Sequence, residues 1–440
     1  MAESPFKMSL YLPAQGAAET EATIIEWYVA QGEHFEKGQA LAQVDSAKSV
    51  FDFEAPCGGL VVRLLHPEGE EVSLAEPVME IETADPAMRD WIPPAASGEK
   101  LPLPARLPAA TPAVNGGRGE EIAIIGIGSY LPERIVTNAE LVEKFPDVSE
   151  QYVYQVTGIR QRHWAADDEK PSDMALQAGR EAIRKSGIGE KDIDAIVLST
   201  TTPDMAMPST ACILQDRLGL PAIPAFDLNA ACSGWLYTVS MARGMILSGL
   251  ARNVLTVGVD LQSRLLDAGD RSAYFIFGDG AGAAVISAAA AGHRIQDIRL
   301  GSDPRGLRMA RREEPGFEVT NGQAGVDPWI RLEGGSLFRL ATENFTNIIR
   351  EVTALSGWDL ADTRWVVPHQ ANGRILKAAA KRSGVPFKRF FLNVDHVGNT
   401  SSASIPLALC EMEAGLDAGD KLVLCSVGAG LTSAAATVEW

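Results

Sequence analysis

A stretch rich in Pro, Ala and Gly at residues 86–119 constrains the fold most, because it separates two regions of different sequence pattern. Such a stretch has few apolar side chains to bury and favours extended, polyproline-like backbone. Residues 1–85 and residues 120–440 are therefore each expected to form a core of their own. We predict that residues 86–119 are a linker, which at about 3.1 Å per residue spans up to roughly 100 Å.

Residues 1–85 contain short apolar runs separated by turns with Gly and Pro, which predicts a small all-β domain. The same region holds four Lys/Arg against sixteen Asp/Glu, a net charge of −12, while the whole chain carries −18. A chain this acidic is a poor partner for nucleic acid. No apolar run approaches the ~18 residues of a membrane span, and the N-terminus lacks the pattern of a secretory signal. We expect a cytoplasmic protein.

Residues 120–440 alternate apolar strands with segments of helical spacing, which predicts an α/β domain with buried strands. Two parts of this region follow one scheme. AIVLST precedes AFDLNAACSG and a helix, and WVVPH precedes FFLNVDHVGNTSS and a helix. Each half thus brings a polar loop to the carboxyl end of a strand, where open α/β sheets place their sites. Five cysteines without a CxxC pair favour neither a disulfide framework nor a metal site.

Lys48 follows Asp45-Ser46-Ala47 between two β runs, in a composition suited to a tight turn. Taken alone, it is a solvated turn lysine. However, TEATIIEWYVAQGEHFEKGQALAQVD, DSAK and EAPCGGLVVRLLHPEGEEV resemble the lipoyl domains of 2-oxo acid dehydrogenase acyltransferases. The resemblance implies a flattened β-barrel with lipoate attached to Lys48. Ala47 and Ser49 stand where biotin carriers usually have methionines, which favours lipoate; biotin or an unmodified lysine remain the alternatives.

Three separated residues of the second region carry candidate chemistry: Cys232, His369 and Asn399. Cys232 stands where a strand turns into a helix, and the helix dipole is expected to lower its pKa. His369 and Asn399 supply neutral N–H donors, which suit an enolate formed by loss of carbon dioxide. Each has an ordinary alternative: a buried structural cysteine, a hydrogen-bonded histidine and a helix cap.

Residues 120–440 resemble β-ketoacyl-ACP synthase III in GIGSYLPE, TGIRQRH, FGDGAGAAV, PHQAN, GNTSSAS and SVGAGLTSAAATVEW. The resemblance implies a five-layered αβαβα thiolase-like fold of two halves and a homodimer. It assigns the nucleophile to Cys232, decarboxylation to His369 and Asn399, and the oxyanion hole to the backbone of Cys232 and Ala429. Thiolases would have a second catalytic Cys and elongating synthases a second His, and Asn399 distinguishes the chain from both.

The same resemblance implies further contacts. The residues for CoA or pantetheine are Tyr152, Arg271, Asn372 and Arg374, with Tyr152 in place of a common Trp. Met207, in place of a common Phe, closes the acyl pocket from the other subunit, and Ser433 replaces a common Trp. Basic residues of a predicted helix would bind an acidic acyl carrier protein, unless they are only a solvated face: Arg374, Lys377, Lys381 and Arg382.

The fusion suggests a hypothesis for the reaction. An acyl group carried by lipoyl-Lys48 would pass to Cys232 and then condense with malonyl-ACP to a 3-oxoacyl-ACP. A 2-oxo acid dehydrogenase decarboxylase component would load the lipoyl group. One alternative is a synthase primed by acyl-CoA, with the lipoyl domain as a tether. Another is a non-condensing acyl-transfer or scaffold component of a dehydrogenase assembly, which the Cys232, His369 and Asn399 set disfavours.

Overall fold

A computed structural model describes residues 5–13, 21–46, 50–74, 76–89, 121–288, 291–313 and 327–440. The chain divides into two compact units, Met1–Val114 and Asn115–Trp440, each with its own hydrophobic core. The division falls inside the stretch predicted as a linker, of which only residues 86–89 are described. Within the described ranges, no helix is long and apolar enough to cross a membrane.

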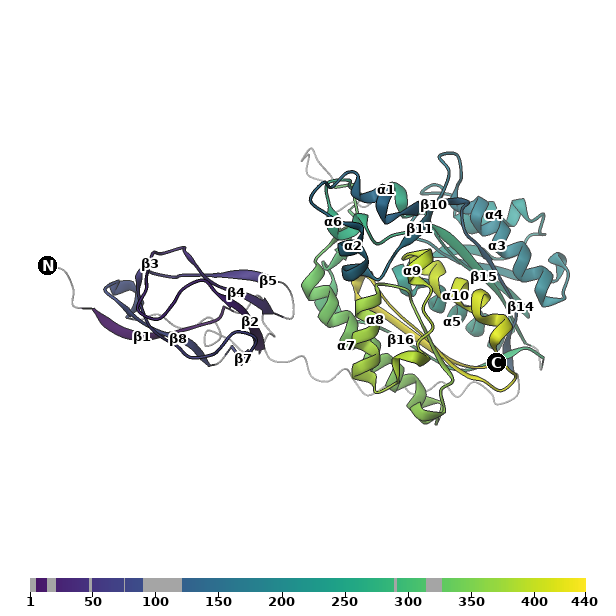
Figure 1. The fold of residues 1–440 in the computed structure, drawn as a ribbon. Coiled ribbons are helices and arrows are strands. Elements are labelled where there is room, and N and C mark those ends of the chain that lie inside the picture. Colours follow the sequence, from purple (N-terminus) through teal and green to yellow (C-terminus); the bar gives the residue numbers. More distant parts are fainter. Residues whose placement is uncertain are drawn as a thin grey trace. The chain divides into compact units, whose positions relative to one another are not determined.

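The first unit consists of two four-stranded antiparallel sheets, drawn in purple in Figure 1. In sheet order they are β1 (Phe6–Tyr11), β8 (Pro77–Thr83), β6 (Gly59–Leu64) and β3 (His34–Phe35), then β5 (Val50–Glu54), β4 (Ala40–Ser46), β2 (Glu21–Trp27) and β7 (Glu71–Ser73). Fully buried side chains from both sheets, such as Leu10, Ile24, Val44 and Ile81, share one core. Two sheets around one core form the flattened barrel that the resemblance implies.

The second unit is built on a nine-stranded mixed sheet. In sheet order the strands are β13 (Ala225–Leu228), β12 (Ala195–Ser199), β14 (Asn253–Asp260), β15 (Gly280–Ala288), β9 (Ile122–Tyr130), β16 (His293–Ser302), β21 (Thr432–Glu439), β20 (Lys421–Gly428) and β19 (Trp365–Pro368). We call residues 121–288 the first half and residues 291–440 the second half. Among the described residues, two pairs between β9 and β16 join the halves within the sheet.

The two halves repeat one topology. From the join outward, the first half runs β9, β15, β14, β12, β13, and the second half runs β16, β21, β20, β19. At the far edge of the second half, Phe390 forms a parallel bridge with Val366 of β19, in the position that β13 occupies in the first half. The apolar run FFLNV, for which the sequence pattern predicts a strand, therefore forms only a bridge, while β16, six of whose ten residues are polar or charged, was not expected from the sequence.

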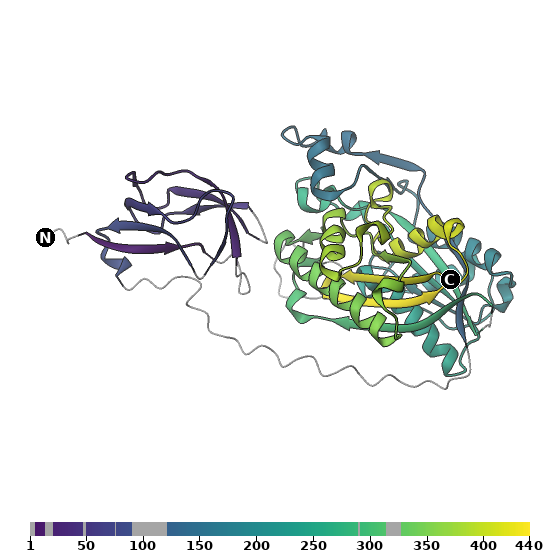
Figure 2. The same ribbon diagram turned by 60° about the horizontal axis from the view of Figure 1, so that its bottom comes forward.

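Six helices complete five layers: α3 (Pro171–Ser186), α4 (Thr210–Arg217), α5 (Gly234–Leu247), α7 (Gly334–Leu355), α8 (Gly373–Ser383) and α10 (Ser404–Met412). In Figure 1, α3 and α4 lie on one outer face, α7 and α8 on the other, and α5 and α10 between the halves. Figure 2 shows the yellow C-terminal strands beside the green outer helices. The arrangement is the αβαβα architecture expected from the sequence.

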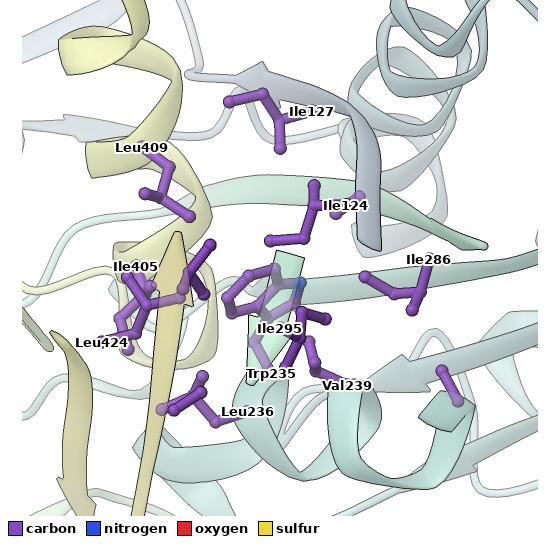
Figure 3. Close-up of a cluster of buried hydrophobic side chains, with 14 of the residues drawn as sticks. Ile124, Ile127, Trp235, Leu236, Val239, Ile286, Ile295, Ile405, Leu409 and Leu424 are labelled. Carbon is purple, nitrogen blue, oxygen red and sulfur yellow. The ribbon is translucent and has the colours of Figure 1, made fainter. Parts of the chain in front are cut away.

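Trp235 is central to the middle layer. It is 1% exposed and packs among aliphatic side chains of α5, α10 and both halves of the sheet (Figure 3), including Ile124, Ile286, Ile405 and Leu424. A buried aromatic side chain contributes several kcal/mol to such a core, roughly 3–5 by the cost of its truncation to alanine. The packing around Trp235 therefore holds the start of α5 and of α10 in place.

Shorter elements complete the described part of the second unit: α1 (Asn138–Val142), α2 (Glu150–Thr157), α6 (Arg271–Tyr274), α9 (Val394–Val397), β10 (Arg134–Thr137), β11 (Gln161–Trp164), β17 (Ala310–Arg311) and β18 (Arg331–Leu332). The segment that holds α9 continues into Asn399, and α2 contacts α8.

Candidate active site

Cys232 lies at a sharp turn between β13 and α5. A single 3-10 turn, Ala231–Ser233, connects the two elements, and Ala231 has a φ of +48°. The Ser426 hydroxyl donates to the Cys232 carbonyl at 2.8 Å and so ties this turn to β20. A Cβ atom at Gly428 would lie 2.8 Å from the Cys232 nitrogen, so a side chain there would displace the turn that holds Cys232.

Backbone strain is concentrated around this site. Among the described residues, three other than glycine have positive φ: Ala231, Ser401 and Leu431, at +48°, +52° and +49°. Each lies one or two residues from Cys232, Asn399 or Ala429. Such conformations cost about 1–3 kcal/mol each and persist where the surrounding structure enforces them. The strain marks all three loops as parts of one pre-organised site.

The Cys232 thiol is held in its protonated form. Burial raises its pKa to about 11, while a hydrogen bond from Ser401 and the backbone N–H groups of Cys232 and Ala429 only partly oppose that rise. The Ser401 hydroxyl donates to the sulfur at 3.6 Å. The lowered pKa expected from the sequence is therefore wrong for the site without substrate. The loss of hydration destabilises the Cys232 thiolate by more than these hydrogen bonds stabilise it.

His369 follows the end of β19 and is 1% exposed. Its backbone N–H donates to the Cys425 carbonyl at 2.7 Å, and its Nδ1 lies 2.6 Å from the Ser404 hydroxyl oxygen. Burial lowers the pKa of His369 to about 3. The imidazole is therefore neutral at physiological pH and carries a single ring proton.

Asn399 has a fixed amide orientation. Its Oδ1 accepts from the Ser401 N–H at 2.9 Å, and its Nδ2 donates to the Ala371 carbonyl at 3.2 Å. The side chain is 5% exposed. An amide nitrogen has two protons, so the second one is available to a ligand.

Cys232, His369 and Asn399 line one cavity of about 500 Å³, as do Ala429 and Ser401. The rest of its wall is mainly apolar and includes Phe277, Ile330, Leu332, Leu337 and Phe345. The structure thus brings together the three residues that the sequence analysis singled out. A thiol beside neutral donors in an apolar cavity suits acyl transfer and the stabilisation of a developing negative charge on oxygen.

Comparison with known proteins places both units in families. The model for 3-oxoacyl-[acyl-carrier-protein] synthase III matches residues 226–304, its C-terminal counterpart matches residues 354–440, and the biotin/lipoyl model, described as biotin-requiring enzyme, matches residues 9–81. A β-ketoacyl-[acyl-carrier-protein] synthase III of Rhodospirillum centenum is 40% identical over 323 residues, which cover 72% of this chain and 98% of the relative. The chain belongs to the β-ketoacyl-ACP synthase III family.

Solved structures agree with this assignment. The synthase III of Thermus thermophilus superposes with a TM-score of 0.68 at 38% identity, covering 72% of this chain and 99% of that structure. The priming β-ketosynthase of the R1128 polyketide pathway gives 0.68 at 32% identity, covering 73% and 96%. The chain is thus an acyl-transferring condensing enzyme with a thiolase-like synthase domain and an N-terminal biotin/lipoyl domain.

Lys48 lies outside the described residues. On either side of it, β4 and β5 are paired, with Asp45 opposite Val50, so the lysine belongs to the connection of a β-hairpin. A lysine in the connection of a β-hairpin of a biotin/lipoyl domain is a suitable attachment site for a covalently bound cofactor. The family match leaves the choice between lipoate and biotin open.

Residues expected to bind CoA or pantetheine lie on α2, α6 and α8 of the synthase domain. Tyr152 is 51% exposed, and Arg271 forms an ion pair with Asp147 at 2.5 Å. Asn372 caps α8 by accepting from the Arg374 N–H at 2.8 Å and donates to the Val156 carbonyl at 3.2 Å. Within the described residues, these four do not line the Cys232 cavity, so their ligand contacts remain a prediction.

The basic residues predicted to bind a carrier protein are exposed on α8. Arg374, Lys377 and Lys381 line a hollow of about 750 Å³ together with Phe338 and Phe387, whereas Arg382 does not. Met207 is 82% exposed and does not line the cavity of its own chain. Its predicted place in the pocket of a second subunit remains a prediction.

The sequence analysis missed several residues of the site. Ser401 and Ser404 contact Cys232 and His369, and the fully buried Asp260 accepts from the N–H and hydroxyl of Ser402 at 3.0 and 2.7 Å. The dense Ser/Thr run directly after Asn399 was the available signal.

Across the described part of the chain, no cluster of His, Cys, Asp or Glu suits a metal ion.

Proposed function

We propose that the chain forms a 3-oxoacyl-ACP from a starter acyl thioester and malonyl-ACP by decarboxylative Claisen condensation. The observation that carries this proposal is the single cavity that contains Cys232, His369 and Asn399. In the first step, the Cys232 sulfur bonds to the acyl carbon, the donor's C–S bond breaks, and the donor leaves as a thiol with the proton of Cys232. The backbone N–H groups of Cys232 and Ala429 stabilise the oxyanion, which is supported by their hydrogen bonds toward the sulfur.

In the second step, His369 and Asn399 donate to the thioester oxygen of malonyl-ACP. Loss of carbon dioxide leaves an enolate, whose carbon attacks the acyl carbon on Cys232. The bond to the Cys232 sulfur then breaks, and the thiol takes up a proton from solvent. Neutral donors suit this step because they stabilise the enolate by hydrogen bonds. A cationic group would form an ion pair with it and slow the release of product. The low pKa of His369 and the fixed amide of Asn399 support these roles.

Substrates enter as CoA or phosphopantetheine thioesters, for which Tyr152, Arg271, Asn372 and Arg374 are the proposed contacts. The relatives are named for an acyl carrier protein. For this chain we assign its docking to Arg374, Lys377, Lys381 and Arg382, because a basic helix beside an exposed Phe387 complements an acidic carrier. A homodimer, with Met207 at the pocket of the partner, completes the proposal.

The starter acyl group is proposed to reach Cys232 from lipoate on Lys48, loaded by a 2-oxo acid dehydrogenase decarboxylase component. Lipoate supplies a thiol that holds an acyl group as a thioester, and exchange between thioesters is nearly isoenergetic. A tether replaces a bimolecular encounter by an effective concentration on the order of mM. The biotin/lipoyl domain in the same chain as a condensing enzyme supports this route.

The variant Lys48→Arg tests the starter route, because arginine cannot form the amide to lipoate. Condensation from a 2-oxo acid and its decarboxylase should fall to background, while condensation from acyl-CoA stays within about twofold of the unchanged chain. Product formation from each starter is measured, and intact mass distinguishes lipoate, biotin and unmodified lysine. Lys37→Arg, in the same domain, is the control and should retain both activities. Full activity of Lys48→Arg with both starters would leave acyl-CoA priming as the function.

A further inference from the structure

Gln262 is a polar side chain in the wall of the cavity that holds Cys232. It stands two residues after β14, is 5% exposed, and lines this cavity together with Thr201, which stands two residues after β12. Neighbouring parts of the same wall, such as Ile276 and Phe277, are apolar. In a mainly apolar cavity, a few fixed polar groups usually set the orientation and the choice of ligand.

Hydrogen bonds fix the orientation of the Gln262 amide. Asp260 Oδ1 accepts from the backbone N–H of Thr201 and from its hydroxyl, each at 2.7 Å. Because the Thr201 hydroxyl gives its proton to Asp260, its oxygen can only accept from Gln262, and Gln262 Nε2 donates to it at 2.9 Å. The amide nitrogen therefore faces Thr201, and Oε1 is at the other end of the amide.

The Gln262 Oε1 atom is an acceptor open to the cavity. Within the described residues, no N–H or O–H group donates to it, and it is not one of the enclosed polar atoms that lack a partner. Since Gln262 is buried except where it lines the cavity, the accessible side of Oε1 faces that space. A ligand in the cavity therefore meets an acceptor that still needs a donor.

A series of short contacts connects Gln262 to the surroundings of Cys232. The Ser401 hydroxyl donates to the Cys232 sulfur at 3.6 Å, and the hydroxyl of the next residue, Ser402, donates to Asp260 Oδ2 at 2.7 Å. Asp260 holds the Thr201 hydroxyl to which Gln262 donates. Gln262 is thus part of the network that surrounds Cys232.

The proposed reaction places the acyl chain on the side of Gln262. The malonyl thioester needs the space beside His369 and Asn399, which belong to the second half. The acyl chain on Cys232 is then left with the wall of the first half, to which Gln262 belongs. A polar group on that chain can reach Oε1.

We propose that Gln262 is a specificity-determining residue that selects a starter acyl group carrying a hydroxyl. A hydroxyl donates to Oε1, whereas a plain alkyl chain covers this acceptor and leaves it unpaired. A keto oxygen and a carboxylate only accept, and a carboxylate is also repelled by the nearby Asp260. The inference rests on the proposed acylation of Cys232 and adds the chemical class of the starter.

Matched pairs of acyl-CoA starters test this preference: 3-hydroxybutyryl-CoA against butyryl-CoA, and 6-hydroxyhexanoyl-CoA against hexanoyl-CoA. Acylation of Cys232 is followed by intact mass over time. In the unchanged chain, at least one hydroxylated starter should have a kcat/KM about 10- to 100-fold above that of its alkyl counterpart, because the alkyl chain leaves Oε1 unpaired.

Three variants locate the source of the preference. Gln262→Met keeps an unbranched side chain without the amide and should bring the ratio to within about threefold of one. Thr201→Val removes the hydroxyl that orients the amide and should lower the ratio by at least about threefold. Gln296→Met changes a glutamine of β16 outside the described lining of the cavity and should keep the ratio of the unchanged chain.

The outcomes separate this inference from the proposed function. If no starter acylates Cys232, the proposed function fails. If Cys232 is acylated but neither hydroxylated starter exceeds its alkyl counterpart by about threefold, the inference about Gln262 is wrong. A preference that persists in folded Gln262→Met would also overturn it. The structure of the acyl-enzyme formed with the preferred starter gives an independent answer, since a hydroxyl more than about 3.5 Å from Oε1 would contradict the proposal.

Discussion

The two halves of the synthase domain share a topology but differ in what they bring to the cavity. The first half supplies Cys232, a half-buried thiol whose pKa is raised to about 11. The second half supplies His369 and Asn399, which are 1% and 5% exposed and neutral. In the proposed reaction, one half holds the atom that changes its bonds, and the other holds fixed donors. The proposed mechanism thus assigns bond making to the first half and charge stabilisation to the second half.

The supporting contacts differ in the same way. Around Cys232, the neighbours are mostly backbone groups, such as the N–H of Ala429 and the close approach of Gly428. Around His369 and Asn399, serine hydroxyls and amides form a network that fixes orientation. A nucleophile must change partners during the reaction, whereas an electrostatic donor acts best when it does not reorganise. If this division is real, variants in the two halves should affect different half-reactions.

The largest effect is expected from Cys232→Ala. Without the sulfur there is no acyl-enzyme, so acylation and condensation should both fall below detection. Decarboxylation of malonyl-ACP should remain measurable, because the donors of the second half are intact. Acylation is followed by intact mass, and decarboxylation by release of carbon dioxide. Cys212→Ala, an exposed cysteine of the same half, is the control and should behave like the unchanged chain. A normal condensation rate in Cys232→Ala would contradict the assignment of bond making to the first half.

A large effect is also expected in the pH dependence of Cys232 alkylation. With a pKa of about 11, roughly one thiol in ten thousand is ionised at pH 7. The pKa is raised, so the thiolate fraction and the rate with iodoacetamide should rise about tenfold per pH unit from pH 7 to 10. Site-resolved mass spectrometry measures this rate, and alkylation of Cys212 monitors reagent access. Fast, pH-independent alkylation near pH 7 would mean that the α5 dipole outweighs burial and that a thiolate is present before substrate binds.

The sequence predicted the parts of the molecule that depend on local pattern. Continuous apolar runs such as those of β9, β14 and β20 are visible in the sequence, because a buried strand needs apolar side chains on both faces. The strand β16 was missed because six of its ten residues are polar or charged and its pairing with β21 is a tertiary contact. Sequence spacing alone does not show that protein surrounds the Cys232 thiol, so the helix dipole taken alone predicts too low a pKa.

The site was predictable in its residue types but not in its supporting contacts. Cys232, His369 and Asn399 each stand in a motif with a recognisable loop, and the fold places them in one cavity. The Ser/Thr run after Asn399 marks the segment that holds Ser404, but its contact with His369 joins segments far apart in the sequence. No local pattern marks Asp260, which accepts from Ser402. The strained φ values at Ala231, Ser401 and Leu431 are likewise visible only in three dimensions.

The smallest of these effects, and the sharpest test of the division, is expected from His369→Ala and Asn399→Ala. Each removes one of two donors to the enolate oxygen, so decarboxylation of malonyl-ACP should fall by about 10²–10³-fold, as for the loss of one oxyanion donor. Acylation of Cys232 should change less than tenfold, because its backbone donors remain. Single-turnover measurements separate the two steps, and His293→Ala, remote from the cavity, is the control. A parallel loss of acylation in His369→Ala would show that the imidazole also takes the thiol proton. The second half would then share in bond making, and the two halves would be less distinct than their contacts indicate.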